Sequence, residues 1–240
     1  MVPGGFSMIK PFLCVCLALS LFFISCSARI SGNVRENGSA EVTIHSSLEP
    51  KMAALLKSFS QTEGDFSIDG AAIGKSMAAA PGIESALFWN EGPSTVSGTI
   101  KISKIGDFLV LSGSNYRFIN YIQTDSGGSL AIELDLKYGP ELISLFSMDV
   151  SDYLAAIMAP VATGEVLTVA EYLDLVTSVY GAGVSNEIKN ARINLSLTVP
   201  GTVKAAQGGT FSKNQAQFNV PLTDILVLAK PVKYEIVWIK

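Results

Sequence analysis

Apolar and polar residues alternate with a period of two along several stretches of the chain. In the stretch 40–48, Ala40, Val42, Ile44, Ser46 and Leu48 fall on one face, and mostly polar residues occupy the positions between them. This alternation is typical of a strand with one buried face. The same pattern predicts strands at 129–137 and 191–199, and shorter ones at 86–90, 95–104, 116–123, 203–206, 210–211, 216–220 and 232–239.

Other stretches have the spacing of an amphipathic helix. Pro50 stands in the first turn of a helix in which Met52, Leu55, Leu56 and Phe59 recur on one side. A second helix is predicted at 70–80, with Asp69 as its N-terminal cap. Three more helical pieces follow at 140–146, 150–158 and 169–180.

The helical pieces after residue 139 form an insertion between runs of strands. Between Lys137 and Lys189 the sequence has seven acidic residues and no basic one, and it is rich in apolar residues. Runs of strands interrupted by a helix cluster indicate the α+β class. We therefore expect a largely antiparallel β-sheet packed against helices, with a helical insertion at about 139–182.

The N-terminal stretch 8–26 has the parts of an export signal. Lys10 precedes an apolar run at 11–24, which is shorter than the roughly 20 residues that span a bilayer. Its end, Phe23-Ile24-Ser25-Cys26, resembles a bacterial lipobox. That resemblance implies a signal peptide at 1–25 and acyl chains, palmitate among them, on Cys26. An ordinary signal peptide cut near Ser27 is the alternative.

Residues after the signal are expected to form a lipidated tether at 26–38, able to pair as a strand, and a single domain at 39–240. Removing residues 1–25 from the 240 leaves 215, enough for one domain with a real core. It also leaves Cys26 as the remaining cysteine, which excludes disulfides and cysteine-based zinc sites. The formal net charge is −4 and no basic cluster is present, so we expect no nucleic-acid partner.

Catalytic motifs are missing from the sequence. His45 is the single histidine and lies on the polar side of its strand, which favours an ordinary solvated side chain. The stretch from Gly70 to Ser76 is one residue short of a phosphate-binding loop, because Asp69 stands where the first glycine belongs. We therefore expect no enzymatic activity, no metal site and no cofactor.

Two longer stretches resemble the LppM-type domain of bacterial lipoproteins. They are GSAEVTIHSSL, beginning at Gly38, and VPGTVKAAQGG…FNVPL…VKYEIVW, which ends at Trp238. The resemblance covers about 31–238 and implies an envelope domain without enzymatic activity, with an apolar pocket for glycolipids between a sheet and covering helices. The family's known type also has a C-terminal membrane segment, whereas this sequence stops at Lys240.

The leading hypothesis is a membrane-anchored lipoprotein of the bacterial cell envelope, facing the periplasm or the cell surface, that binds a lipid or another apolar ligand. The predicted ligand contacts lie on the stripes of the inserted helices: Leu154, Ile157, Met158, Tyr172, Leu173 and Val176. The alternative is a structural or assembly lipoprotein that contacts a protein partner through these apolar helices.

Overall fold

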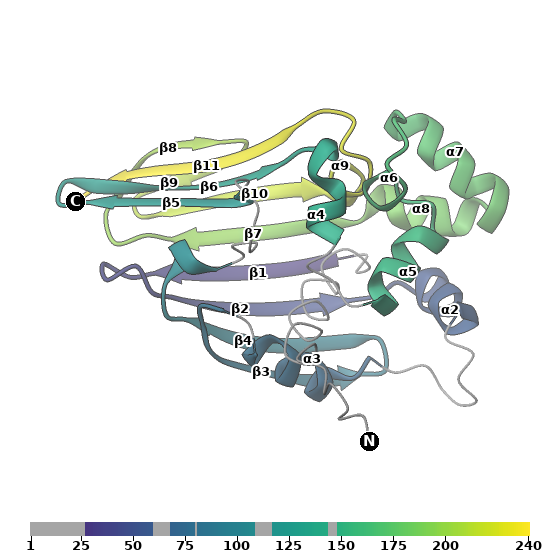
Figure 1. Ribbon diagram of the computed structural model, residues 1–240, viewed down its shortest axis with the longest axis horizontal. Coiled ribbons are helices and arrows are strands. Elements are labelled where there is room, and N and C mark those ends of the chain that lie inside the picture. Colours follow the sequence, from purple (N-terminus) through teal and green to yellow (C-terminus); the bar gives the residue numbers. More distant parts are fainter. Residues whose placement is uncertain (1–26, 60–67, 80, 109–116, 144–147) are drawn as a thin grey trace, which may run out of the picture.

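Two β-sheets and a cluster of helices at one end make up the molecule (Figure 1). The computed structural model describes residues 27–59, 68–79, 81–108, 117–143 and 148–240. The predicted signal peptide at 1–25 and Cys26 lie outside these residues. Within them, no helix has both the length and the apolar composition that crossing a membrane requires.

The large sheet has seven strands among the described residues, in the order β3-β4-β2-β1-β7-β10-β9. Neighbouring strands run antiparallel except for β1 and β7, which are parallel. The strands are β1 (Ser27–Val34), β2 (Ala40–Ser47), β3 (Ile83–Gly92), β4 (Thr95–Ile102), β7 (Arg192–Thr198), β9 (Thr210–Ser212) and β10 (Gln215–Pro221).

A second, four-stranded sheet covers part of the inner face of the large one (Figure 1). Its order is β5-β6-β11-β8, and all its pairs are antiparallel. The strands are β5 (Ile119–Thr124), β6 (Gly127–Leu134), β8 (Thr202–Gln207) and β11 (Val232–Ile239). The predicted α+β class is confirmed, but the strands form two facing layers where we expected a single sheet covered by helices.

The helices fall into two groups. Helix α3 (Gly70–Ala78) packs on the inner side of β3, where Gly74 lets the helix approach the backbone of Phe88 closely. Asp69 caps it by accepting a hydrogen bond from the Ala72 amide at 2.9 Å, as predicted. The other helices are α2 (Pro50–Phe59), α4 (Gly139–Ile143), α5 (Met148–Ala156), α6 (Pro160–Thr163), α7 (Val169–Tyr180), α8 (Ala182–Asn190) and α9 (Leu222–Val227), with 3-10 turns η2 (Ile105–Asp107) and η3 (Leu136–Tyr138).

The predicted end of the helical insertion at 182 is wrong. Gly181 has φ +85° and ends α7, but the chain continues directly into α8, which runs to Asn190. Val184 and Ile188 are four residues apart and both buried, so α8 has its own apolar side. Gly181 therefore marks a corner between two helices.

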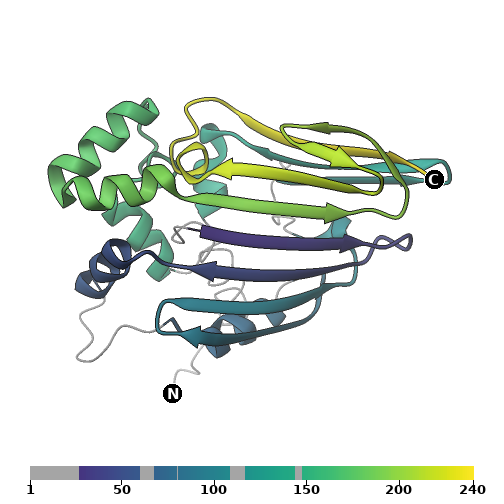
Figure 2. The same ribbon diagram turned by 180° about the vertical axis from the view of Figure 1, so that it is seen from behind.

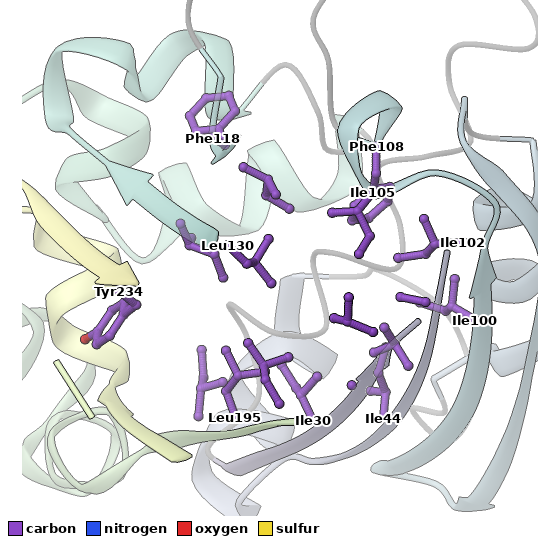
Figure 3. Close-up of a pocket in the computed structure, with 18 of the residues that line it drawn as sticks. Ile30, Ile44, Ile100, Ile102, Ile105, Phe108, Phe118, Leu130, Leu195 and Tyr234 are labelled. Atoms are coloured by element: carbon purple, nitrogen blue, oxygen red, sulfur yellow. The ribbon is translucent and has the colours of Figure 1, made fainter. Parts of the chain in front are cut away.

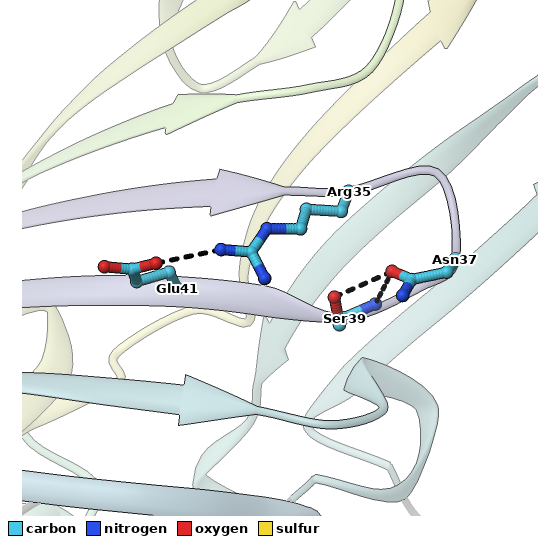
Figure 4. A network of polar contacts seen from close by, with 4 residues as sticks. All are labelled: Arg35, Asn37, Ser39 and Glu41. Carbon is cyan, nitrogen blue, oxygen red and sulfur yellow. Dashed lines mark hydrogen bonds and ion pairs between the residues drawn. The ribbon is translucent and has the colours of Figure 1, made fainter.

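The segment predicted as a tether able to pair as a strand does so, because residues 27–34 form strand β1. Ile30 pairs with Ile44 of β2 on one side and with Leu195 of β7 on the other. A turn joins β1 to β2, and in it the Asn37 side chain accepts hydrogen bonds from the Ser39 amide and hydroxyl at 3.0 and 2.7 Å (Figure 4). Arg35 and Glu41 form an ion pair of 2.9 Å beside this turn (Figure 4). The domain therefore begins at Ser27, immediately after Cys26.

Deleting residues 27–34 should prevent folding. The deletion removes the strand that joins β2 to β7 and would leave both with unpaired backbone groups in the middle of the sheet. A chain that starts at Ser27 retains every described element and serves as the control. Circular dichroism and thermal unfolding should show a folded domain with a cooperative transition for the chain that starts at Ser27 and neither for the shorter chain. A cooperative transition in the shorter chain would show that residues 27–34 are a tether after all.

Candidate functional site: an apolar cavity between the sheets

A cavity of about 260 Å³ lies between the two sheets. The large sheet contributes its inner side chains from β1, β2, β4, β7 and β10, and the small sheet contributes those from β5, β6 and β11. Helix α3, helix α4, helix α9 and the turn η2 each contribute one residue to the wall: Met77, Leu142, Ile225 and Ile105. Figure 3 shows side chains from these elements converging on the space, including Ile30, Ile44, Ile100, Ile102, Ile105, Phe108, Phe118, Leu130, Leu195 and Tyr234.

The strands in the middle of the large sheet contribute two small inward-facing residues to the wall, Gly32 of β1 and Ala40 of β2. A Cβ added at Gly32 would come within 2.7 Å of Leu197 Cδ2, so the leucine side chain lies over this glycine. The surrounding positions are mostly isoleucine, valine and leucine, and their branched side chains restrict how far the wall can adjust.

The wall offers no hydrogen bond to an occupant. Within the described part of the chain, every atom exposed to the cavity is apolar. Tyr234 belongs to the wall, but Figure 3 shows its hydroxyl oxygen on the side of the ring away from the other labelled side chains. Burial is the main cause that raises the pKa of this tyrosine, and the Asp224 carboxylate adds to the effect. The hydroxyl therefore stays neutral, and the ring presents hydrocarbon to the cavity.

An apolar space of this size, if unfilled, leaves the side chains of its wall without van der Waals contacts on one side. Ordered water is a poor filler, because a buried water needs two to four polar partners and this wall has none among the described residues. An apolar molecule is better suited than water to occupy the cavity.

The six ligand contacts predicted on the inserted helices do not line this cavity. Leu154 and Ile157 are buried near the end of α5, and Tyr172 and Val176 are buried on α7. Met158 and Leu173 are partly exposed at the same end of the molecule. The stripes thus serve the packing of the helix cluster, and a role for these residues in ligand binding stays a prediction.

Among these six residues, Tyr172 has a polar group that is buried without a partner. Its side chain is fully buried, and its hydroxyl has no hydrogen-bond partner in the structure. Burial raises the pKa of Tyr172 strongly, and the neighbouring Tyr180 adds to the shift. The nearby Tyr180 hydroxyl donates to the Ala156 carbonyl and so joins α7 to the end of α5.

Comparison with known proteins adds one likeness. A scan against protein-family models finds no matching family, and a search of curated proteins finds no significant match. Among solved structures, the chain is similar to the NMR structure of the folded domain of Mycobacterium tuberculosis LppM. The TM-score is 0.39 at 11% sequence identity, with 89% of this chain and 88% of that chain covered. This is the domain type that the sequence resembles. The similarity is weak, and the function proposed below rests on the cavity.

The sequence predicts the strands that build the cavity wall, but it does not predict a cavity between two sheets. The inward positions of β2, Val42 and Ile44, were predicted as one buried face. Nothing in their alternation tells a face packed against helices from one that meets a second sheet. No group of three or more potential metal ligands comes together within the residues that the structure describes.

Replacing Ala40 by valine should stabilise the protein. The two added methyl groups would enter open space, and cavity-filling changes commonly add about 0.5–2 kcal/mol. Ala86 offers a matched control: it is also a buried alanine of the large sheet, but it lies outside the cavity wall, under α3. Ala86→Val should therefore destabilise by about 1–3 kcal/mol through overpacking. Urea unfolding measures both, and equal destabilisation would mean that no usable space exists beside Ala40.

Proposed function

We propose that this protein is a membrane-anchored envelope lipoprotein that binds an apolar ligand, such as the acyl chain of a lipid, between its two sheets, and that it acts without catalysing a reaction. The observation that carries this proposal is the cavity wall of pure hydrocarbon. Ligand sites are usually apolar with a few polar groups that fix orientation. The described wall lacks such groups, so the site would discriminate between ligands by their shape and hydrophobicity.

The size of the cavity limits the ligand. An apolar cavity of 150 Å³ holds benzene, so 260 Å³ holds on the order of ten carbon atoms. One medium-length alkyl chain, or part of a longer one, fits this estimate, whereas several chains at once do not. Burying such a chain is favourable by about 0.8 kcal/mol per CH₂.

Anchoring is the second part of the proposal, and it rests on the lipobox-like end of the signal, Phe23-Ile24-Ser25-Cys26. Since β1 begins at Ser27, an acylated Cys26 would leave no spacer between the membrane and the sheet. Ser27 pairs with Ser47 and Arg192, which are at the end of the sheet that leads into α2 and follows α8. The helical end would then face the bilayer.

Ligand binding is tested with a chain that starts at Ser27, since it retains every described element. The probe is N-phenyl-1-naphthylamine, whose emission rises in apolar surroundings, with displacement by decanol. Val42→Phe puts a ring into the cavity and should weaken probe binding at least about tenfold, a loss of about 1.4 kcal/mol. Leu173→Phe, on the helical stripe, is the matched control and should bind as the wild type does.

Three results would count against the inter-sheet site. The first is no enhancement of probe emission in the wild type. The second is an unchanged affinity in Val42→Phe. The third is a loss in Leu173→Phe alone, which would return the site to the helices. Tyr234→Phe should bind normally in every case, because the hydroxyl that it removes faces away from the cavity.

Anchoring is tested separately by metabolic labelling with palmitate in a bacterial host. The full chain should incorporate the label and fractionate with membranes. Cys26→Ala should lose the label, because the thiol that receives the lipid is gone. Labelling of the variant at the wild-type level would refute the lipobox assignment, and it would leave the ligand-binding result untouched.

A further inference from the structure

No helix or strand among the described residues covers the outer face of the large sheet. Seen from behind, its strands lie in front of all the other elements, and no described helix crosses them (Figure 2). The side chains on this face alternate along each strand with those of the cavity wall. Arg29 lies between Ala28, which is buried, and Ile30, which is partly buried. Asn194 lies between Ile193 and Leu195. The outer face is therefore a second surface, on the opposite side of the sheet from the proposed ligand.

One row on this face continues across six strands. The strand pairing places Trp89 beside Ser97, Ser97 beside His45, and His45 beside Arg29. Arg29 is in turn beside Asn194, and Asn194 is beside Asn219. Neighbouring strands are about 4.8 Å apart, so the row has one side chain at each such step. Ser97 is the buried member of the row. The next row on the same face runs through Leu87, Thr99, Thr43, Ser31, Ser196 and Gln217.

The polar side chains of the first row are held in place by one another. Asn219 donates to the Asn194 side-chain oxygen at 2.7 Å. His45 Nδ1 lies 2.9 Å from the Ser97 hydroxyl and 3.4 Å from a carboxylate oxygen of Glu91. These contacts fix the side chains before any partner arrives, which lowers the entropy lost on binding.

Two large apolar side chains stand at the β3 end of these rows. Trp89 is 47% exposed and Leu87 is 69% exposed. They alternate along β3 with Ala86 and Phe88, which are buried. An exposed indole offers a flat apolar surface with a polar edge, which is suited to stacking against a partner that is apolar on one face and polar at its rim.

The charge on the two rows excludes several partners. Arg29 is their one permanent cation, and Glu91 lies beside His45, so the described rows hold no cluster of either sign. A nucleic acid or an anionic membrane would require a group of cations. Hydroxyl and amide side chains both donate and accept hydrogen bonds, and so do the hydroxyls of a sugar. The two rows of side chains therefore match an uncharged partner that carries hydroxyl groups.

We infer that the outer face of the large sheet binds an extended, uncharged glycan chain along the row from Trp89 to Asn219. The rise of one sugar in an extended β-linked glycan is close to the strand spacing of about 4.8 Å, so successive sugars meet successive strands. Trp89 stacks on the apolar face of one sugar. His45, Arg29, Asn194 and Asn219 bind the hydroxyls of the next ones. This inference does not depend on the apolar ligand.

Retention on chitin, an uncharged and extended β-linked glycan, tests this inference with the full chain in detergent. Trp89→Ala should lower retention at least about tenfold, since tryptophan is prominent among the residues whose truncation weakens binding most. Phe211→Ala is the matched control. Phe211 is exposed to a similar fraction, 49%, but it pairs with Ala216, whose side chain lies on the inner face. This variant should be retained as the wild type is.

Tryptophan fluorescence gives an independent reading, because the chain has two tryptophans and Trp238 is only 1% exposed. Acrylamide should quench mainly Trp89, and added chito-oligosaccharide should protect it. No retention of the wild type, unchanged retention of Trp89→Ala, or an equal loss in Phe211→Ala would overturn the inference. So would a dimer in sedimentation that Trp89→Ala abolishes, because the face would then be occupied by a second copy of the chain.

Discussion

The space between the two sheets is the constraint on which the rest of the structure depends. Its wall is hydrocarbon throughout the described residues, so neither water nor a polar group can fill it favourably. An unfilled space of this kind leaves the wall without van der Waals contacts on one side. The two hydrogen-bonded sheets hold the wall in place.

The position of β1 explains how the walls are held. This strand pairs antiparallel with β2 and parallel with β7, and it thereby joins the N-terminal strands of the sheet to the C-terminal ones. It also supplies Ile30, Gly32 and Val34 to the cavity wall. A lipid on Cys26 would therefore be attached directly to the strand that forms the floor of the site, so anchoring and ligand binding would be linked by a single rigid element.

Much of the fold follows from the sequence, because period-two alternation and helical stripes are local signals. The hairpin of β5 and β6 and the capped helix α3 were predicted from such signals. The pairing partners of β1 were not, since its Ser27–Val34 segment is short and largely polar and follows the apolar N-terminal stretch. Its place in the sheet depends on a strand far along the chain.

The cavity between the sheets could not be predicted from the sequence. Apolar content suggested a pocket on the inserted helices, whose residues Leu154, Tyr172 and Val176 are buried in the structure. The wall of the cavity combines Ile44, Leu130 and Leu195 from three distant strands. Each strand shows only that one of its faces is buried. Whether that face meets a helix, a sheet or open space is decided by long-range packing, which no local pattern records.

Methyl NMR with an added alkyl ligand tests the central claim most directly. With decanol bound to the chain that begins at Ser27, nuclear Overhauser effects should connect the alkyl protons with the methyl groups of Ile44, Ile132 and Leu195, which face the cavity from both sheets. Contacts with Leu154 or Leu173 in place of these, or no contact with any methyl group of the wall, would contradict the account.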